Sequence, residues 1–100
     1  MFSGGSYEEV ARWLKMFLNS HAKREHPRIE AALEDDDARV CYAAQLHFGE
    51  RVSPLMEFDY KDVAAHRGEL AWCADLAQRV RREARALLAG SASGNVATRR

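Results

Sequence analysis

The sequence predicts an α+β domain in the order N-terminal helix, three-stranded antiparallel β-meander, long C-terminal helix (α-β-β-β-α), with both helices on one sheet face. Three observations support this fold. Residues 38–60 alternate between apolar and polar side chains in two runs separated by a reversal, which is typical of strands buried on one face. A capped amphipathic segment precedes these runs, and a long amphipathic segment follows them. We therefore expect a single domain over residues 1–90 and a flexible tail over residues 91–100.

The first helix is expected to begin at a capping box. The hydroxyl of Ser6 can accept the amide of Glu9, and the carboxylate of Glu9 can reach back to the amide of Ser6. Apolar residues then recur at helical spacing: Val10, Trp13, Leu14, Phe17 and Leu18. Pro27 disfavours helical geometry at the residue before it, so the helix should stop by about residue 25.

Residues 28–34 are expected to form the first strand, joined to the second by a two-residue turn at Asp36 and Asp37. This register places the apolar residues of both strands on one side of the sheet. Its facing pairs are Leu33 with Val40, Ala31 with Tyr42, Ile29 with Ala44, and Glu34 with Arg39. The alternative is a mainly helical fold in which residues 28–36 form a third helix, because Ala, Leu and Glu favour helix.

The second hairpin is expected to turn through a three-residue loop, Gly49 to Arg51. The apolar residues of both strands have even numbers, so the two residue numbers of each facing pair must add to an even number. These pairs are Phe48 with Val52, Leu46 with Pro54, and Ala44 with Met56. Pro54 lacks an amide donor and therefore belongs on an edge strand, where the order of a meander places it.

The last helix is expected to begin between residues 59 and 62, to end near residue 88, and to divide at Gly68 if it divides at all. Its packing seam follows a 3-4-3-4-3 spacing: Leu70, Cys73, Ala77, Val80, Ala84 and Leu87. The expected core comprises Val10, Trp13, Leu14, Phe17, Leu18, Ile29, Leu33, Val40, Tyr42, Leu46, Phe48, Val52, Met56, Phe58, Leu70, Cys73, Leu76 and Val80.

Composition excludes several classes of function. Lys plus Arg equals Asp plus Glu at 15 each, so no global field attracts the chain to nucleic acid or to a membrane. No apolar run approaches the length of a membrane span and no signal peptide is evident, which together predict a cytoplasmic protein with Cys41 and Cys73 as free thiols. Arginine outnumbers lysine twelve to three, which indicates a GC-rich bacterial coding sequence.

Neither a metal site nor a catalytic site is predicted, and no cofactor is expected. The four histidines lack the i, i+4 spacing of a helical zinc pair, and no Cys-x-x-Cys occurs. His47 beside Ser53, with a carboxylate nearby, is the only acid–base assembly that the predicted sheet allows. A solvated strand face produces such neighbours routinely, so we expect no enzymatic activity. Cys41 would need a nearby base to act as a nucleophile, and its expected neighbours are Ala32 and Asp59.

Nucleic-acid binding is the alternative function, through the arginines of the last helix: Arg79, Arg81, Arg82 and Arg85. The predicted order of elements is similar to that of double-stranded RNA-binding modules, although no sequence motif accompanies the likeness. Such modules use the first hairpin turn and the start of the last helix. Here the turn is a run of four acids, residues 34–37, which phosphates would repel. Cations at a helix C-terminus also complement the helix dipole, so we do not expect nucleic-acid binding to be the main role.

The favoured interpretation is a protein–protein interaction or self-associating domain, with a homodimer or an unidentified protein as the partner. The sheet face opposite the helices would carry a small, weakly polar patch framed by charges. Its candidate interaction residues are Ala32, Cys41, Ala43, Gln45, His47 and Leu55. An uncovered sheet with such a centre often pairs with another surface, and its edges are open to strand addition.

Overall fold

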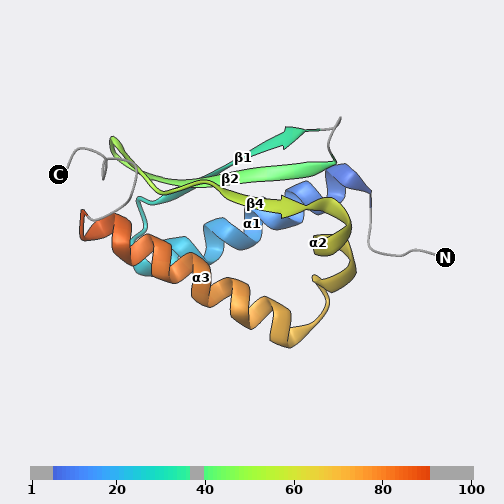
Figure 1. The fold of residues 1–100 in the computed structure, drawn as a ribbon. Helices are drawn as coiled ribbons and strands as arrows, with labels where there is room; N and C mark the ends of the chain where they lie inside the picture. Colours follow the sequence, from blue (N-terminus) through green and yellow to red (C-terminus); the bar gives the residue numbers. More distant parts are fainter. Residues whose placement is uncertain (1–5, 37–39, 91–100) are drawn as a thin grey trace.

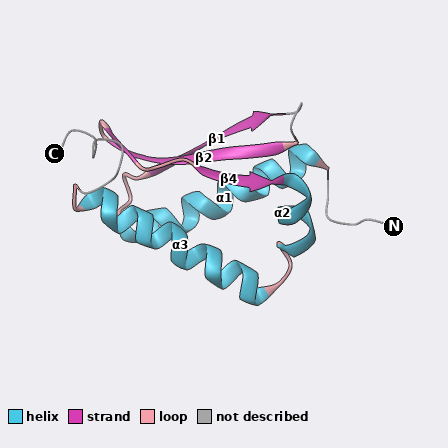
Figure 2. Ribbon diagram, in the orientation of Figure 1, coloured by secondary structure: helices cyan, strands magenta, loops and turns pink. Residues whose placement is uncertain are grey.

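The computed structural model describes residues 6–36 and 40–90, and the predicted tail, residues 91–100, lies outside them. Within the described residues, three helices and four strands follow the chain in the order shown in Figure 1. They are α1 (Tyr7–Glu25), β1 (Glu30–Asp36), β2 (Cys41–Phe48), β3 (Arg51–Val52), β4 (Met56–Asp59), α2 (Tyr60–His66) and α3 (Leu70–Leu88). The helices cover one side of an antiparallel sheet (Figure 2), which confirms the α+β class. The mainly helical alternative is wrong, because residues 30–36 form β1.

The first helix has the predicted boundaries and the predicted cap. The Glu9 amide donates to the Ser6 hydroxyl at 3.1 Å, and the Ser6 amide donates to the Glu9 carboxylate at 3.0 Å. These bonds satisfy donors that would otherwise be left without partners at the helix start. The helix ends at Glu25, two residues before Pro27.

Strand β2 is the centre of the sheet, with β1 on one side and β3 and β4 on the other. The expected third strand is interrupted, which makes the sheet four-stranded. His47 pairs with Val52 and Ala44 pairs with Met56, so two residues of β2 face three on the other side. This extra residue is a β-bulge. The predicted pairing of Ala44 with Met56 is confirmed.

The bulge changes the hairpin register by one residue, so the pairs predicted for Phe48 and Leu46 are wrong. Phe48 pairs with Arg51, which leaves a two-residue turn in place of the expected three. Gly49 opens this turn with φ of +64°, a conformation that glycine adopts without strain.

The register of β1 on β2 also differs from the prediction. Leu33 pairs with Ala44 and Ala31 with Leu46, a shift of four residues along β2. Glu34 faces Ala43 rather than Arg39. The expected turn is wrong because Asp36 continues β1 and pairs with Cys41. An even shift leaves every side chain on its predicted face, which is why alternation alone could not detect the error.

The last helix is divided at the predicted place. Asp59 caps α2, its carboxylate accepting the Asp62 amide at 3.1 Å, and the link to α3 contains Gly68. The buried stripe of α3 consists of Leu76, Val80, Ala84 and Leu87. Leu70, expected in that seam, is 88% exposed because it is the first residue of α3.

The core lies between the sheet and the helices, and most of the expected apolar residues belong to it. The buried ones are Val10, Leu14, Leu18, Ile29, Tyr42, Leu46, Met56, Phe58, Leu76 and Val80. Trp13, Phe17, Leu33 and Phe48 pack against this core while partly exposed. Val40 was expected inside, but it lies in the turn before β2 with φ of +54° and is 40% exposed.

Candidate interaction surfaces

The sheet face opposite the helices, called the outer face below, carries the residues predicted to mediate interaction. Cys41, Ala43, Gln45 and His47 alternate along β2 with its buried residues, and Ala32 of β1 faces Gln45. Alternation therefore places these five residues on one face. Leu55 lies in the bulge beside β2 and is 60% exposed. No described helix covers this face (Figure 1).

Carboxylates surround the centre of the outer face. Glu34 and Glu57 lie on either side of Ala43, Asp59 lies opposite Cys41, and Glu30 lies opposite His47. These four acids are exposed. No lysine or arginine occupies an outward position on the described strands, so the outer face is negative around a small, weakly polar centre. At the edge of the sheet, the ammonium group of Lys23 on α1 lies 3.5 Å from the carboxylate of Glu30.

The acid–base assembly considered for His47 and Ser53 is not formed. His47 is on the outer face opposite Val52, whereas Ser53 is fully buried. The Ser53 hydroxyl accepts the Leu46 amide at 2.9 Å and donates to the Pro54 carbonyl at 3.0 Å. This hydroxyl stabilises the bulge and is not available as a nucleophile.

Within the described residues, neither thiol is paired with a basic side chain. Cys41 faces Asp36 and Asp59 across the sheet, which corrects the expected contact with Ala32. Burial raises the pKa of the Cys73 thiol, which donates to the Arg67 carbonyl at 3.3 Å. Among the described residues, no group of three His, Cys, Asp or Glu side chains is placed to hold a metal ion.

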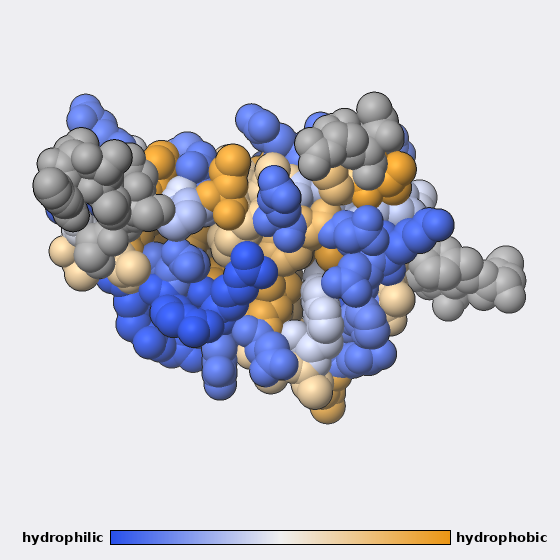
Figure 3. All heavy atoms as spheres, viewed as in Figure 1, coloured by the Kyte–Doolittle hydropathy of each residue, from blue (hydrophilic) through white to orange (hydrophobic). Residues whose placement is uncertain are grey.

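Some arginines of α3 form ion pairs with α1, and others are exposed to solvent. Arg81 and Arg85 bind the carboxylate of Glu25 on α1, at 2.8 and 3.3 Å. The hydrogen bond from Arg81, followed by that from Arg85, lowers the pKa of Glu25. Arg82 lines a shallow hollow of about 370 Å³ with Gln78 and these two arginines. Figure 3 shows the resulting hydrophilic surface over the C-terminal half of α3.

A second surface, which sequence patterns did not reveal, is a groove between β4 and α3. Figure 3 shows hydrophobic atoms exposed between these elements, flanked by hydrophilic side chains. The β4–α3 groove has a volume of about 320 Å³. Its lining consists of Glu57, Phe58, Asp59, Asp62, Trp72, Asp75, Leu76 and Arg79. Its existence depends on the break between α2 and α3, and no single motif encodes it.

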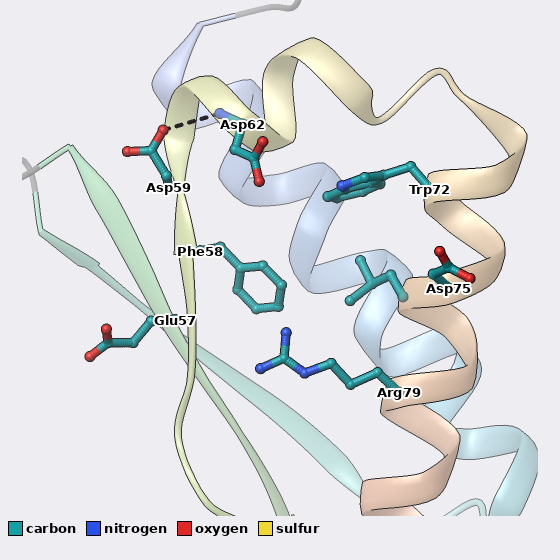
Figure 4. A pocket seen from close by; sticks show the side chains of 8 residues that line it. Glu57, Phe58, Asp59, Asp62, Trp72, Asp75 and Arg79 are labelled. Carbon is teal, nitrogen blue, oxygen red and sulfur yellow. Dashed lines mark hydrogen bonds between the residues drawn. The ribbon is translucent and has the colours of Figure 1, made fainter.

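The side chains of the groove have distinct positions in Figure 4. Phe58 and Trp72 point into it from β4 and α3, and Asp62 approaches from α2. Arg79 reaches across from α3, with its guanidinium 5.6 Å from the centre of the Phe58 ring, a cation–π contact. Glu57 and Asp59 point to the opposite side of β4, toward the outer face.

Three tyrosines fix the end of the sheet beside the groove. The Tyr7 hydroxyl donates to the Cys41 carbonyl, and the Tyr42 hydroxyl donates to the Tyr7 carbonyl, each at 2.8 Å. Tyr60 lies beside them, 5.5 Å from Tyr7 between ring centres. Burial raises the pKa of the Tyr42 hydroxyl far above its usual value. These contacts hold α1, β2 and the start of α2 together.

Comparison with known proteins identifies no relative: no protein-family model, no curated protein and no solved structure matches the chain. Among the described helices, none has the length and apolar character that crossing a membrane would require.

Proposed function

We propose that this chain is a non-enzymatic protein–protein interaction domain, which binds a positively charged surface of a partner protein through the outer face of its sheet. The observation that carries the proposal is the uncovered centre formed by Ala32, Cys41, Ala43 and Gln45 inside a border of carboxylates. Small side chains allow close approach of a partner. The carboxylates around this centre favour a partner surface that is positively charged.

The same charges argue against two copies stacked face to face. A symmetric dimer places identical patches against each other, so the carboxylates of Glu34 and Glu57 would lie close to those of the second copy. Like charges across an interface cost free energy unless counterions screen them. A homodimer formed through this face should therefore tighten as salt is added, whereas a complex with a basic partner should weaken.

Ala43→Arg tests the proposal because it places a bulky cation at the centre of the outer face. The matched control is Ala74→Arg, the same change at an exposed position of α3. A partner captured by the native chain is purified, and the binary complex is reassembled from the two pure proteins. We expect Ala43→Arg to weaken the complex at least tenfold and Ala74→Arg to leave its affinity unchanged. Equal affinity for both variants would exclude the outer face as the docking surface.

Light scattering at two salt concentrations tests self-association. We expect a mass near 11.3 kDa that is independent of protein concentration. A mass that doubles with concentration, and more readily at high salt, would replace the basic partner with a second copy of this chain.

A further inference from the structure

The outer edge of β4 is a free strand edge within the described part of the chain, since β4 pairs with β2 alone. The Tyr60 amide donates to the Val40 carbonyl at 3.1 Å, which continues the β2–β4 register. Because hydrogen-bonded and non-bonded pairs alternate in an antiparallel ladder, Phe58 bonds to β2 and Glu57 does not. The amide and carbonyl of Glu57 therefore point away from β2.

The β4–α3 groove lies along this same edge. It has an apolar wall of Phe58, Trp72 and Leu76 on the side of the helices. Glu57 and Asp59 project on the other side of β4. An extended segment added to β4 would present alternate side chains to these two environments. One set would pack on the apolar wall, and the other would lie beside two carboxylates.

Charge selects the chemistry of the second set. Four carboxylates border the groove, those of Glu57 and Asp59 on the outer side of β4 and those of Asp62 and Asp75 on the helix side. They outnumber the guanidinium of Arg79 and the imidazole of His66, which lies 3.5 Å from Asp62, and the excess favours lysine or arginine over an anion. The chain already places a cation of its own on Phe58, because Arg79 occupies the face of that ring. The groove thus accepts both an apolar side chain and positive charge.

Two other surfaces have fewer of the features that would bind a partner. The free edge of β1 is partly covered, because the Asn19 side chain accepts the outward amide of Ala31 at 2.8 Å. The arginine hollow on α3 is partly neutralised by Glu25, which binds Arg81 and Arg85. The β4–α3 groove combines a free backbone edge, an apolar wall and an excess of carboxylates over cations.

We infer that the β4–α3 groove binds an extended segment of another protein in which apolar residues alternate with lysine or arginine. The segment adds to β4 as a further strand and pairs with the amide and carbonyl of Glu57. This inference does not require a partner on the outer face, because the backbone edge and the apolar wall belong to the groove; the two surfaces share only the carboxylates of Glu57 and Asp59.

The probe is the blocked peptide acetyl-SVKVRVS-amide, with acetyl-SVEVDVS-amide as the matched acidic peptide. Binding to the full chain is followed by NMR titration at low salt and at about 150 mM salt, where exposed charge pairs are partly screened. We expect saturable binding of the basic peptide only. Amide hydrogen exchange should slow at Glu57, whose amide points outward, and should stay unchanged at Phe58.

Two pairs of exposed variants locate the site. Glu57→Gln should weaken the basic peptide about threefold to fivefold, while Glu30→Gln, the same change on the far edge of the sheet, should not. Arg79→Met should tighten binding by a similar factor, because it removes a competing cation from the Phe58 ring, whereas Arg82→Met should have no effect.

Several outcomes would overturn the inference. They are equal binding of the two peptides, unchanged exchange at Glu57 under saturation, or weaker binding of the basic peptide by Arg79→Met. Loss of binding through Glu30→Gln and Ala43→Arg, with Arg79→Met silent, would move the peptide to the outer face and leave the proposed function standing. If Ala43→Arg alone fails to weaken its complex, the proposed function of the outer face is contradicted and the inference about the groove still stands.

Discussion

The ionisation of His21 is coupled to folding. It lies in α1 with its ring centre 4.4 Å from that of Phe17. Partial burial, then the charges of Arg24 on the same helix and Arg81 on α3, lower the pKa of His21. The folded state therefore favours the neutral imidazole, whereas in the unfolded chain the imidazole has its ordinary pKa of about 6.5.

The sign of this shift predicts a loss of stability in mild acid. The free energy of unfolding that neutral His21 contributes is present above the pKa of the unfolded state. It is lost as the pH falls through the lowered pKa of the folded state. We expect the urea midpoint to fall between pH 7.5 and 5.5, and His21→Gln to reduce that fall. His47→Gln, on the outer face, is the control that should retain it. An unchanged pH dependence in His21→Gln would contradict the prediction.

At the same scale, sequence reasoning identified the cap and most of the buried apolar residues, because these depend on neighbours three or four positions away. It did not identify Ser53 as buried, since a serine in a strand is usually solvated. It also left out buried alanines such as Ala11, Ala22 and Ala64, whose small side chains give a weak periodic signal. Burial of a small residue depends on which helix crosses above it, and that information is tertiary.

At the scale of elements, the bulge between β3 and β4 is the main departure from the predicted meander. It depends on the Ser53 hydroxyl, which accepts the Leu46 amide inside the core. Ser53→Ala leaves that amide without its partner, and we expect it to lower the free energy of unfolding by about 1–3 kcal/mol. Ser20→Ala, at an exposed position of α1, should change it by less than about 0.5 kcal/mol. Urea denaturation measures both, and equal effects would show that the hydroxyl does not stabilise the bulge.

The order and type of the elements could be predicted because period 2 and period 3.6 are local properties of the chain. The registers could not. A shift of four residues in the β1–β2 pairing preserves the face of every side chain, and only the position of the turn distinguishes the alternatives. The acids at the end of β1 resembled a turn but continue the strand as far as Asp36.

At the scale of the whole molecule, the distribution of arginine argues against nucleic-acid binding. Arg81 and Arg85 bind Glu25, and Arg79 lies over Phe58, so the cations of α3 do not form one free surface. Tracking of phosphates requires several aligned cations. The similarity in element order to RNA-binding modules is therefore not matched by the arrangement of charge.

We expect little binding of a labelled duplex RNA or duplex DNA at about 150 mM salt. The informative variant replaces Arg79, Arg82 and Arg85 together with alanine. Submicromolar binding that this variant abolishes would contradict the expectation and favour a nucleic-acid-binding role. Fluorescence anisotropy over a salt series measures it, because any weak association should decline steeply as salt is added.

The candidate surfaces differ in how far the sequence anticipated them. Alternation along β2 placed Cys41, Ala43, Gln45 and His47 on one face before any pairing was known. The β4–α3 groove required the bend after His66 and the distance between a strand and a helix that are separated in the chain. A surface contained in one element can be predicted from periodicity, whereas a surface between elements requires the fold.

The attachment of α3 is uneven along its length. Arg51, at the tip of the β2–β3 hairpin, donates to the carbonyls of Leu87 and Leu88 at 3.0 and 3.1 Å. Glu25 holds Arg81 and Arg85 in the same half of the helix. These polar contacts lie in the C-terminal half of α3, whereas the end near Trp72 is held by ring contacts with Trp13 and His66. Packing of aromatic rings, rather than hydrogen bonds from the hairpin, therefore positions the end of α3 that forms the wall of the groove.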